Sequence, residues 1–192
     1  MDIRREVFWT PWDAPEIEHL QLTAGQGEVV ADGLIVGLAE GRPFRASYLI
    51  RCDGAWRVRE IQVRLMVPGQ RELRLLADGE GHWTSPGGET HAPLDGCFDG
   101  DLSATPSTNT LPIRRLGLRP GDSADIMVAF IGVPALSVTP RPQRYTRLDD
   151  DHDGGARYRY ESRDGDFTAD LPVDIDGLVG DYPGLFRRIW SS

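Results

Sequence analysis

Residues 28–56 read EVVADGLIVGLAEGRPFRASYLIRCDGAW, and this stretch decides the fold class. Its apolar and β-branched residues form extended runs, which are separated by the dipeptides Asp-Gly, Glu-Gly and Asp-Gly. Such dipeptides are typical of hairpin turns, and runs of this composition are typical of strands. We therefore predict an antiparallel meander. Its strands cover residues 28–31, 34–38 and 44–51, and a further strand starts at Trp56.

The strand that starts at Trp56 changes its apolar face partway along. Apolar residues stand at even positions up to Val58 and at odd positions from Ile61 to Val67, so the pattern slips near Arg59 and Glu60. A strand keeps one face buried across such a slip only through a β-bulge or a sharp bend. We therefore predict a bulge here, and bulges curve sheets.

The rest of the chain adds more strand patterns and few helical ones. We predict strands in LDGCFDGDL, ADIMVAFI, ALSVTPRPQRYTRL, RYRYES and DFTADLPVDI, and a short helix in the tail GLVGDYPGLFRRIW. The run ADIMVAFI is apolar enough for burial on both faces. Ten or more short strands are typical of a sandwich or barrel. The bulge and the unbroken meander favour one highly curved sheet.

Length and charge narrow the classes of function. The 192 residues predict one domain, covering 1–192, and the net charge is -9. This charge argues against a nucleic-acid partner, which requires a basic footprint, and against attraction to anionic membranes. All strongly basic residues are arginines. The absence of lysine excludes Schiff-base and phosphate-loop lysines and leaves arginine to recognise carboxylate or phosphate groups.

The sequence also predicts where the protein works. The first twenty residues do not resemble a signal peptide, and no apolar run approaches the roughly 20 residues that span a bilayer. Two cysteines, Cys52 and Cys97, are too few for a disulfide scaffold. We expect a cytoplasmic protein with free thiols.

Motifs for metals and common cofactors are missing from the sequence. The four histidines, His19, His82, His91 and His152, are scattered and give no metal spacing. The segment DDDHDGGARYRYE begins like a calcium loop through Asp149, Asp151 and Asp153, but Glu161 comes one residue too late, so we interpret it as a solvated acidic turn. There is no nucleophile elbow and no dinucleotide fingerprint. We expect no metal and no cofactor.

The segment ATPSTNTLPIRRLGL, residues 104–118, is the best candidate for a helix. Thr105-Pro106 resembles a helix start, but Pro112 prevents a smooth helix from there; a start at Asn109 or Thr110 and an end before Gly117 is equally allowed. Arg114 and Arg115 would point about 100° apart, so at least one needs an acidic partner, a ligand or water.

Several segments together resemble a known family. In order, they are DGAWRVREIQV, LDGCFDGDLSATP, TPSTNTLPIRRLGLRPGDS, PALSVTPRPQRY and VDIDGLVGDYPGLFRR. They resemble the bacterial family named "putative glycolipid-binding proteins", over about residues 28–188. One departure is Ser107, which stands where the family's TPxTNTLPIRRL motif is commonly aromatic and so reduces the expected apolar contact.

The resemblance implies a mainly β fold of a specific kind. It is a spiral β-roll, in which one long, curved antiparallel sheet wraps around a single helix, similar to the carriers that move lipoproteins across the bacterial periplasm. The segment 104–118 would be that helix. A sheet that wraps incompletely leaves an apolar groove or cavity, although fold alone does not establish function.

We expect non-enzymatic binding of an amphiphile, such as a glycolipid, in that groove. Apolar sheet residues would hold acyl chains. Polar side chains would meet a sugar or anionic head group or line the opening: Thr105, Asn109, Thr110, Arg114, Arg115, Tyr145, Tyr158 and Tyr160. In the strand RYRYES the two tyrosines share one face and the arginines the other, which suits either buried tyrosines or a cavity wall.

Two alternatives stay open. One is a structural or partner-binding protein with a filled core, in which Asn109 and Thr110 cap the helix and the two helix arginines pair with carboxylates such as Asp174 or Asp176. The other is a small hydrolase or isomerase that acts on a lipid or sugar derivative. Its acid–base groups would be Asp99, Asp101 or Asp174, but no nucleophile–base pair is visible in the sequence.

Overall fold

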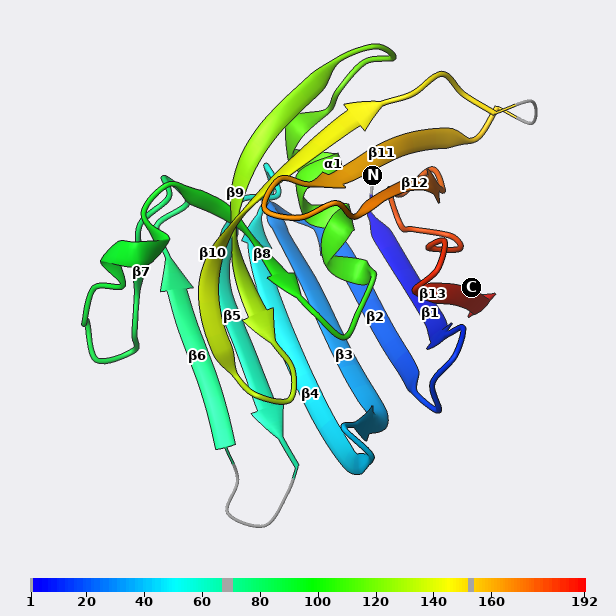
Figure 1. The fold of residues 1–192 in the computed structure, drawn as a ribbon. Helices are drawn as coiled ribbons and strands as arrows, with labels where there is room; N and C mark the ends of the chain where they lie inside the picture. Colours follow the sequence, from blue (N-terminus) through cyan, green and yellow to red (C-terminus); the bar gives the residue numbers. More distant parts are fainter. Residues whose placement is uncertain (1, 67–70, 152–153) are drawn as a thin grey trace.

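The computed structural model describes residues 2–66, 71–151 and 154–192. The predictions made for Val67, His152 and Asp153 fall outside these residues. The fold is mainly β, and its described part contains one α-helix and two short 3-10 helices. The predicted fold class is confirmed at this level: the protein has a large, curved antiparallel sheet (Figure 1).

The larger sheet has eight strands, all of them antiparallel to their neighbours. Their order across the sheet is β13-β1-β2-β3-β4-β5-β6-β7. The strands are β1 (Ile3–Pro11), β2 (Ile17–Gly25), β3 (Glu28–Ala39), β4 (Arg42–Asp53), β5 (Val58–Leu65), β6 (Arg71–Ala77), β7 (Trp83–Thr84) and β13 (Phe186–Ser191). From β1 to β5, consecutive strands pair because short connections join them, as the meander pattern predicts.

The smaller sheet has five strands in the order β12-β11-β10-β9-β8. They are β8 (Cys97–Leu102), β9 (Ser123–Gly132), β10 (Ser137–Arg147), β11 (Ala156–Ser162) and β12 (Thr168–Val173). The expected single sheet is therefore divided in two, and β8 and β9 run parallel. A parallel pair needs a crossover of a dozen or more residues. The crossover here contains η2 (Ser107–Asn109) and α1 (Thr110–Leu116), which Figure 1 shows between the two sheets.

The predicted bulge in β5 is confirmed. Arg51 pairs with Glu60 and Cys52 pairs with Val58, so Arg59 is the extra residue. Val58 and Ile61, on either side of the slip, are both fully buried. The bulge thus returns the apolar side chains of β5 to the core.

One predicted turn is wrong. Asp32-Gly33 lies in the middle of β3, which continues from Glu28 to Ala39. Gly33 pairs with Tyr48 across the sheet, and a Cβ atom at Gly33 would lie 2.1 Å from the Tyr48 ring. The glycine therefore provides room for an aromatic ring rather than a turn. The next dipeptide, Glu40-Gly41, does form the turn, with φ of 51° and 74°.

The two chain ends also differ from the predictions. At the N-terminus, the sequence patterns did not predict the strands β1 and β2. At the C-terminus, the predicted short helix is wrong, because the last residues of the tail form the strand β13, which pairs with β1. The indole N–H of Trp9 in β1 donates to the Val179 carbonyl at 3.1 Å, which holds the segment before β13 against the core. Trp190 then pairs with Phe8. The neighbouring edge strand, rather than local propensity, decides the structure of this tail.

Side chains from both sheets and from the crossover fill the interior. The largest of them are Trp9, Trp83, Tyr48 and Tyr145, each at most 2% exposed. Leu111 and Ile113 of α1 belong to the same cluster. The run ADIMVAFI in β9 was predicted to be buried on both faces. Two successive residues, which point to opposite faces, are buried only at its centre, at Val128 and Ala129. The apolar core therefore positions α1, and the cavities described below lie around it.

Candidate ligand-binding site

The central segment is a short helix that begins late, as one of the two predicted starts requires. A 3-10 turn over Ser107–Asn109 leads into α1, and Gly117 ends the helix with φ of 56° while its N–H donates to the Ile113 carbonyl. Pro112 is tolerated because the first turn of a helix has no internal acceptor for its backbone N–H. Ser107, noted in the sequence as a departure from the motif, is buried, and its hydroxyl lies beside that of Tyr48.

The start of the segment is bonded to the larger sheet through a buried carboxyl group. Thr105 donates to Oε1 of Glu18 at 2.6 Å, and Tyr48 donates to the same oxygen and lies 2.8 Å from the Ser107 hydroxyl. Oε2 of Glu18 has no partner among the described residues. Burial raises the pKa of Glu18 to about 7, against the lowering effect of these hydroxyl groups. Sequence reasoning missed Glu18, although it shares the even, buried positions of β2 with Leu20 and Leu22.

The next residues are bonded to the smaller sheet. The Tyr145 hydroxyl donates to Oδ1 of Asn109 at 2.7 Å, and Asn109 donates to the Pro106 carbonyl at 3.0 Å. Asp101 accepts from Thr108 at 2.9 Å and from Gln143 at 2.7 Å. The Thr110 hydroxyl is buried and has no partner in the described part of the chain. Neither Asn109 nor Thr110 caps a helix with its side chain, contrary to that alternative.

The two helix arginines point to different surroundings. Arg115 donates from Nε to Oδ1 of Asp99 at 2.9 Å and from Nη2 to Oδ2 at 2.5 Å. Asp99 is fully buried, and its burial raises its pKa, which Arg115 partly offsets. Arg114 is exposed; its guanidinium lies 5.2 Å from the Trp56 ring centre and donates to the Ile175 carbonyl at 3.5 Å. Sequence analysis predicted an acidic partner, a ligand or water for at least one of the two arginines, and Arg115 has an acidic partner.

The expected partners of the arginines, Asp174 and Asp176, are bound elsewhere. Arg5 donates to Asp176 at 2.5 Å and to Asp174 at 3.2 Å, and Arg188 donates to Asp174 at 2.7 Å. These ion pairs hold the C-terminal segment against β1. They leave the Arg114 guanidinium without a carboxylate partner among the described residues.

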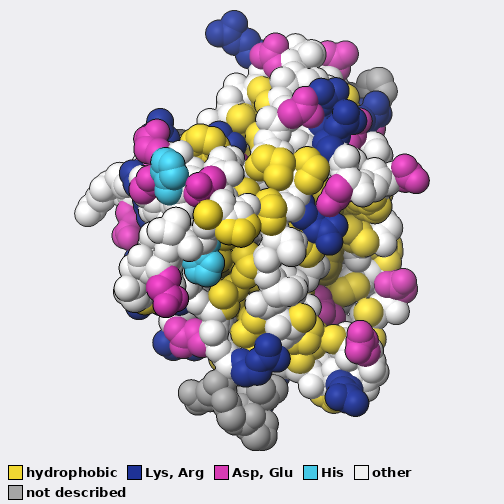
Figure 2. All heavy atoms as spheres, turned by 60° about the vertical axis from the view of Figure 1, so that its left-hand side comes forward, with side chains coloured by type: hydrophobic (Ala, Val, Ile, Leu, Met, Phe, Trp, Pro, Cys, Tyr) yellow, Lys and Arg dark blue, Asp and Glu magenta, His cyan; other side chains and the backbone are white. Residues whose placement is uncertain are grey.

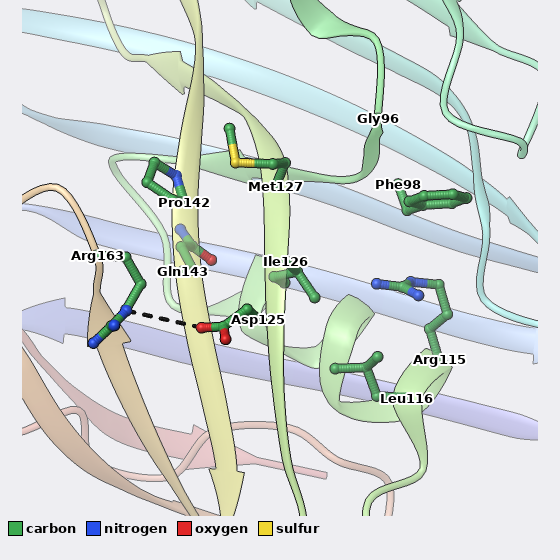
Figure 3. A pocket seen from close by; sticks show the side chains of 10 residues that line it. All are labelled: Gly96, Phe98, Arg115, Leu116, Asp125, Ile126, Met127, Pro142, Gln143 and Arg163. Atoms are coloured by element: carbon green, nitrogen blue, oxygen red, sulfur yellow. Dashed lines mark ion pairs between the residues drawn. The ribbon is translucent and has the colours of Figure 1, made fainter.

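A groove of about 670 Å³ lies where β9 extends beyond β8 (Figure 3). Because β8 pairs with β9 only from Met127 onward, residues 123–126 form a free edge on that side in the described structure. The apolar wall of the groove consists of Phe98, Leu116, Ile126, Met127 and Pro142. Figure 2 shows hydrophobic side chains gathered along the middle of the face that it presents.

Charged groups flank this apolar wall. On the helix side, the guanidinium of Arg115 lies 5.5 Å from the Phe98 ring centre. On the other side, Arg163 and Asp125 form an ion pair at 3.8 Å. The groove is therefore apolar along its middle and offers a guanidinium group on each side (Figure 3).

Two smaller cavities adjoin the same crossover. One, of about 120 Å³, is lined by Thr105, Asn109 and Tyr160 of the predicted residues and by Asp101, Phe167 and Tyr182; we call it the aromatic cavity. The other, of about 270 Å³, is lined by Arg114, Tyr158 and Arg147.

The structure thus does not bring the eight predicted residues into one site. Arg115 lies in the groove, three residues lie in the aromatic cavity and two in the third cavity. Tyr145 is buried beside α1, and Thr110 is buried as the first residue of that helix. What the eight residues share is that each lies in the crossover or next to it.

Acid–base and nucleophilic chemistry has little support from these surroundings. Burial raises the pKa of Cys52 to about 12 and that of Cys97 to about 11, which makes both thiols poor nucleophiles. Asp101 is half-buried; desolvation raises its pKa, as it does that of Asp99, and its carboxyl group is hydrogen-bonded to neighbouring side chains. No group of His, Cys, Asp and Glu among the described residues could hold a metal ion. None of the described helices is long and apolar enough to cross a membrane.

Comparison with known proteins identifies relatives of the chain. A family described as "Putative glycolipid-binding" matches residues 6–188. A crystal structure of a DUF1089-family protein from Pseudomonas aeruginosa is similar, with 41% sequence identity and a TM-score of 0.82 over 93% of this chain and 95% of that one. No curated protein matches the chain.

Proposed function

Because the chain belongs to the glycolipid-binding family, we propose that it binds an amphiphile without catalysis, in the groove between β8, β9 and α1. The observation that carries this proposal is the apolar wall with a guanidinium group on each side. An acyl chain would lie against Phe98, Ile126 and Met127. Arg115 and Arg163 would meet the polar or anionic head group. The volume of about 670 Å³ falls in the usual range of ligand sites.

Three broader expectations from the sequence accompany this proposal, and the spiral roll is the one that rests on the family resemblance. The protein would be one domain over residues 1–192, and its curved sheets would form the spiral roll of the lipoprotein carriers. It would act in the cytoplasm. A shared roll would favour a carrier-like role, in which the ligand is held rather than converted.

The proposal is tested by native mass spectrometry with decanoate and decyl β-glucoside as probes. We expect the wild-type chain to bind both in one-to-one stoichiometry. Phe98→Ala should weaken binding about tenfold, because it removes an aromatic side chain that is 39% exposed on the groove wall. Phe167→Ala is the matched control for decanoate, since Phe167 is equally exposed but lies outside the groove. Equal decanoate binding by wild type and Phe98→Ala would remove the groove from the proposal.

A second candidate is a partner-binding protein with a filled core. The observation that favours it is the packing between the two sheets, where large side chains such as Trp9, Trp83 and Tyr48 are almost fully buried. Under this alternative neither probe binds, and organic extraction of the purified protein releases no lipid.

A further inference from the structure

The aromatic cavity has a different composition from the groove. It lies beside the ends of β8 and β9, next to β11 and the segment that precedes β13. Its volume of about 120 Å³ is several times the roughly 10–15 Å³ that one water needs by the same measure. The cavity can therefore accept a small ring rather than a single water.

Three aromatic rings form one side of this cavity. The ring centre of Tyr160 lies 6.0 Å from that of Phe167 and 6.3 Å from that of Tyr182, and the last two lie 6.1 Å apart. The rings are tilted to one another by 38° to 65°, so they form a corner rather than a stack. The negative faces of such rings attract weakly positive C–H groups, which line the faces of a sugar ring.

Polar groups from the crossover and β8 form the other side. The carboxylate of Asp101 is oriented by Thr108 and Gln143, one on each oxygen, which leaves a further acceptor position on each. The side chain of Asn109 is fixed by Tyr145 and the Pro106 carbonyl and retains one N–H. Tyr182 is 5% exposed, and its hydroxyl has no hydrogen bond to any described residue. The hydroxyl is not among the buried polar atoms that lack a partner, so it reaches accessible space, where a ligand or water can satisfy it.

The charge of the cavity indicates which ligands fit. Of the described residues that line it, Asp101 is the one with an ionisable acidic or basic group other than the tyrosine phenols, and none is a cation. A phosphate or carboxylate group would meet no lining guanidinium there, in contrast to the groove and the third cavity; the guanidinium of the nearby Arg141 lies over the ring of Phe130, 4.5 Å from its centre. Neutral hydroxyl groups, by contrast, can donate to Asp101 and accept from Asn109 and Tyr182.

We propose that the aromatic cavity binds one neutral sugar ring. Asp101 and Asn109 would hold its hydroxyl groups, and Tyr160, Phe167 and Tyr182 would pack against its faces. The hydrogen bond between Asp101 and Gln143 joins a wall residue of this cavity to a wall residue of the groove. That the sugar is the head group of a bound amphiphile rests on the proposed function; that the cavity binds a sugar does not.

The test uses sugars without an acyl chain. Saturation-transfer NMR is recorded on the full chain with the methyl glycosides of glucose, galactose, mannose and N-acetylglucosamine as probes. We expect transfer to at least one of them. Tyr182→Phe should weaken its binding about fivefold, the usual effect of one neutral hydrogen bond, and should leave the melting temperature unchanged because the hydroxyl has no protein partner.

Two further variants separate this inference from the proposed function. Phe167→Ala should abolish methyl-glycoside binding and retain decanoate binding, whereas Phe98→Ala should retain methyl-glycoside binding and weaken decanoate binding about tenfold. Absence of transfer from all four glycosides to the wild-type chain, or equal binding by wild type and Tyr182→Phe, would overturn the inference. If the inference about the sugar fails in this way, decanoate binding still tests the proposed function of the groove independently.

Discussion

Glu18 places a carboxyl group in the interior at a position where the pattern of β2 otherwise has leucines. It accepts hydrogen bonds from Thr105 and Tyr48, and no basic side chain is among the causes that shift its pKa. The protonated form is favoured because a buried charge without a cation is costly. Its link to Thr105 connects the crossover to the larger sheet, so the protonation state of one residue affects how firmly the crossover is held.

We predict that stability depends on pH through Glu18. Its pKa is about 7 in the folded protein and near 4.5 when unfolded, so its contribution is present below the unfolded value and is lost as pH rises through about 7. Urea unfolding of wild type and Glu18→Gln at about pH 5 and pH 8 measures this. The free energy of unfolding of the wild type should fall by up to ~3 kcal/mol more than that of the variant. Glu16, whose pKa is also raised by burial, is common to both proteins, so parallel profiles would contradict the role of Glu18.

At the scale of elements, α1 is held by polar contacts on two sides. The Tyr48–Ser107 and Tyr145–Asn109 contacts fix its start, and the Arg115–Asp99 pair fixes its end to β8. A seven-residue helix has little intrinsic stability in water. The helix therefore depends on these contacts and on the burial of Leu111 and Ile113.

We predict that the neighbouring arginines of α1 differ in their effect on stability. Arg115→Leu should lower the free energy of unfolding by about 3–5 kcal/mol, because it leaves the fully buried Asp99 without its partner. Arg114→Leu should cost less than about 1 kcal/mol, since Arg114 is exposed and contacts Trp56 and one carbonyl. Denaturant unfolding measures both. Adding Asp99→Asn to Arg115→Leu should restore part of the loss, and equal losses for the two arginines would contradict the prediction.

The sequence predicted those elements whose signals are local. The face change around Arg59, the turn at Glu40-Gly41 and the helix end at Gly117 each depend on a few adjacent residues. The prediction of a turn at Asp32-Gly33 failed because a glycine is required there to make room for the ring of Tyr48, which is distant in the chain. The prediction of a helix at the C-terminus failed for the same reason, because the strand that forms there pairs with β1, at the other end of the sequence.

The sequence named polar and aromatic residues that lie around the crossover, but not how they are arranged there. Strand alternation shows which face a side chain occupies, and so Tyr158 and Tyr160 were correctly placed together on one face of β11. It does not show which strands pair. The groove depends on the pairing of β8 with β9 beginning only at Met127, and the aromatic cavity depends on the placement of Tyr182 beside Tyr160. Both depend on contacts between residues that are far apart in the sequence.

At the scale of the whole molecule, one apolar cluster connects the two sheets. It includes Ile35 and Ile61 from the larger sheet, Ile131 and Leu171 from the smaller one, and Leu111 from α1. Gly100 of β8 has no room for a side chain, since a Cβ atom there would lie 2.1 Å from Ile61 of β5. Two sheets that share a core in this way are expected to lose their structure together.

We predict a single unfolding transition, and the aromatic residues of the chain can report it from both sheets. All five tryptophans lie in the larger sheet or in segments joined directly to its strands: Trp9, Trp12, Trp56, Trp83 and Trp190. Four of the five tyrosines lie in the smaller sheet or just before β13: Tyr145, Tyr158, Tyr160 and Tyr182. Tryptophan fluorescence and fluorine NMR of fluorotyrosine-labelled protein should therefore give the same urea midpoint. An earlier midpoint from the tyrosines would show that the smaller sheet unfolds separately, and would contradict the single domain expected over residues 1–192.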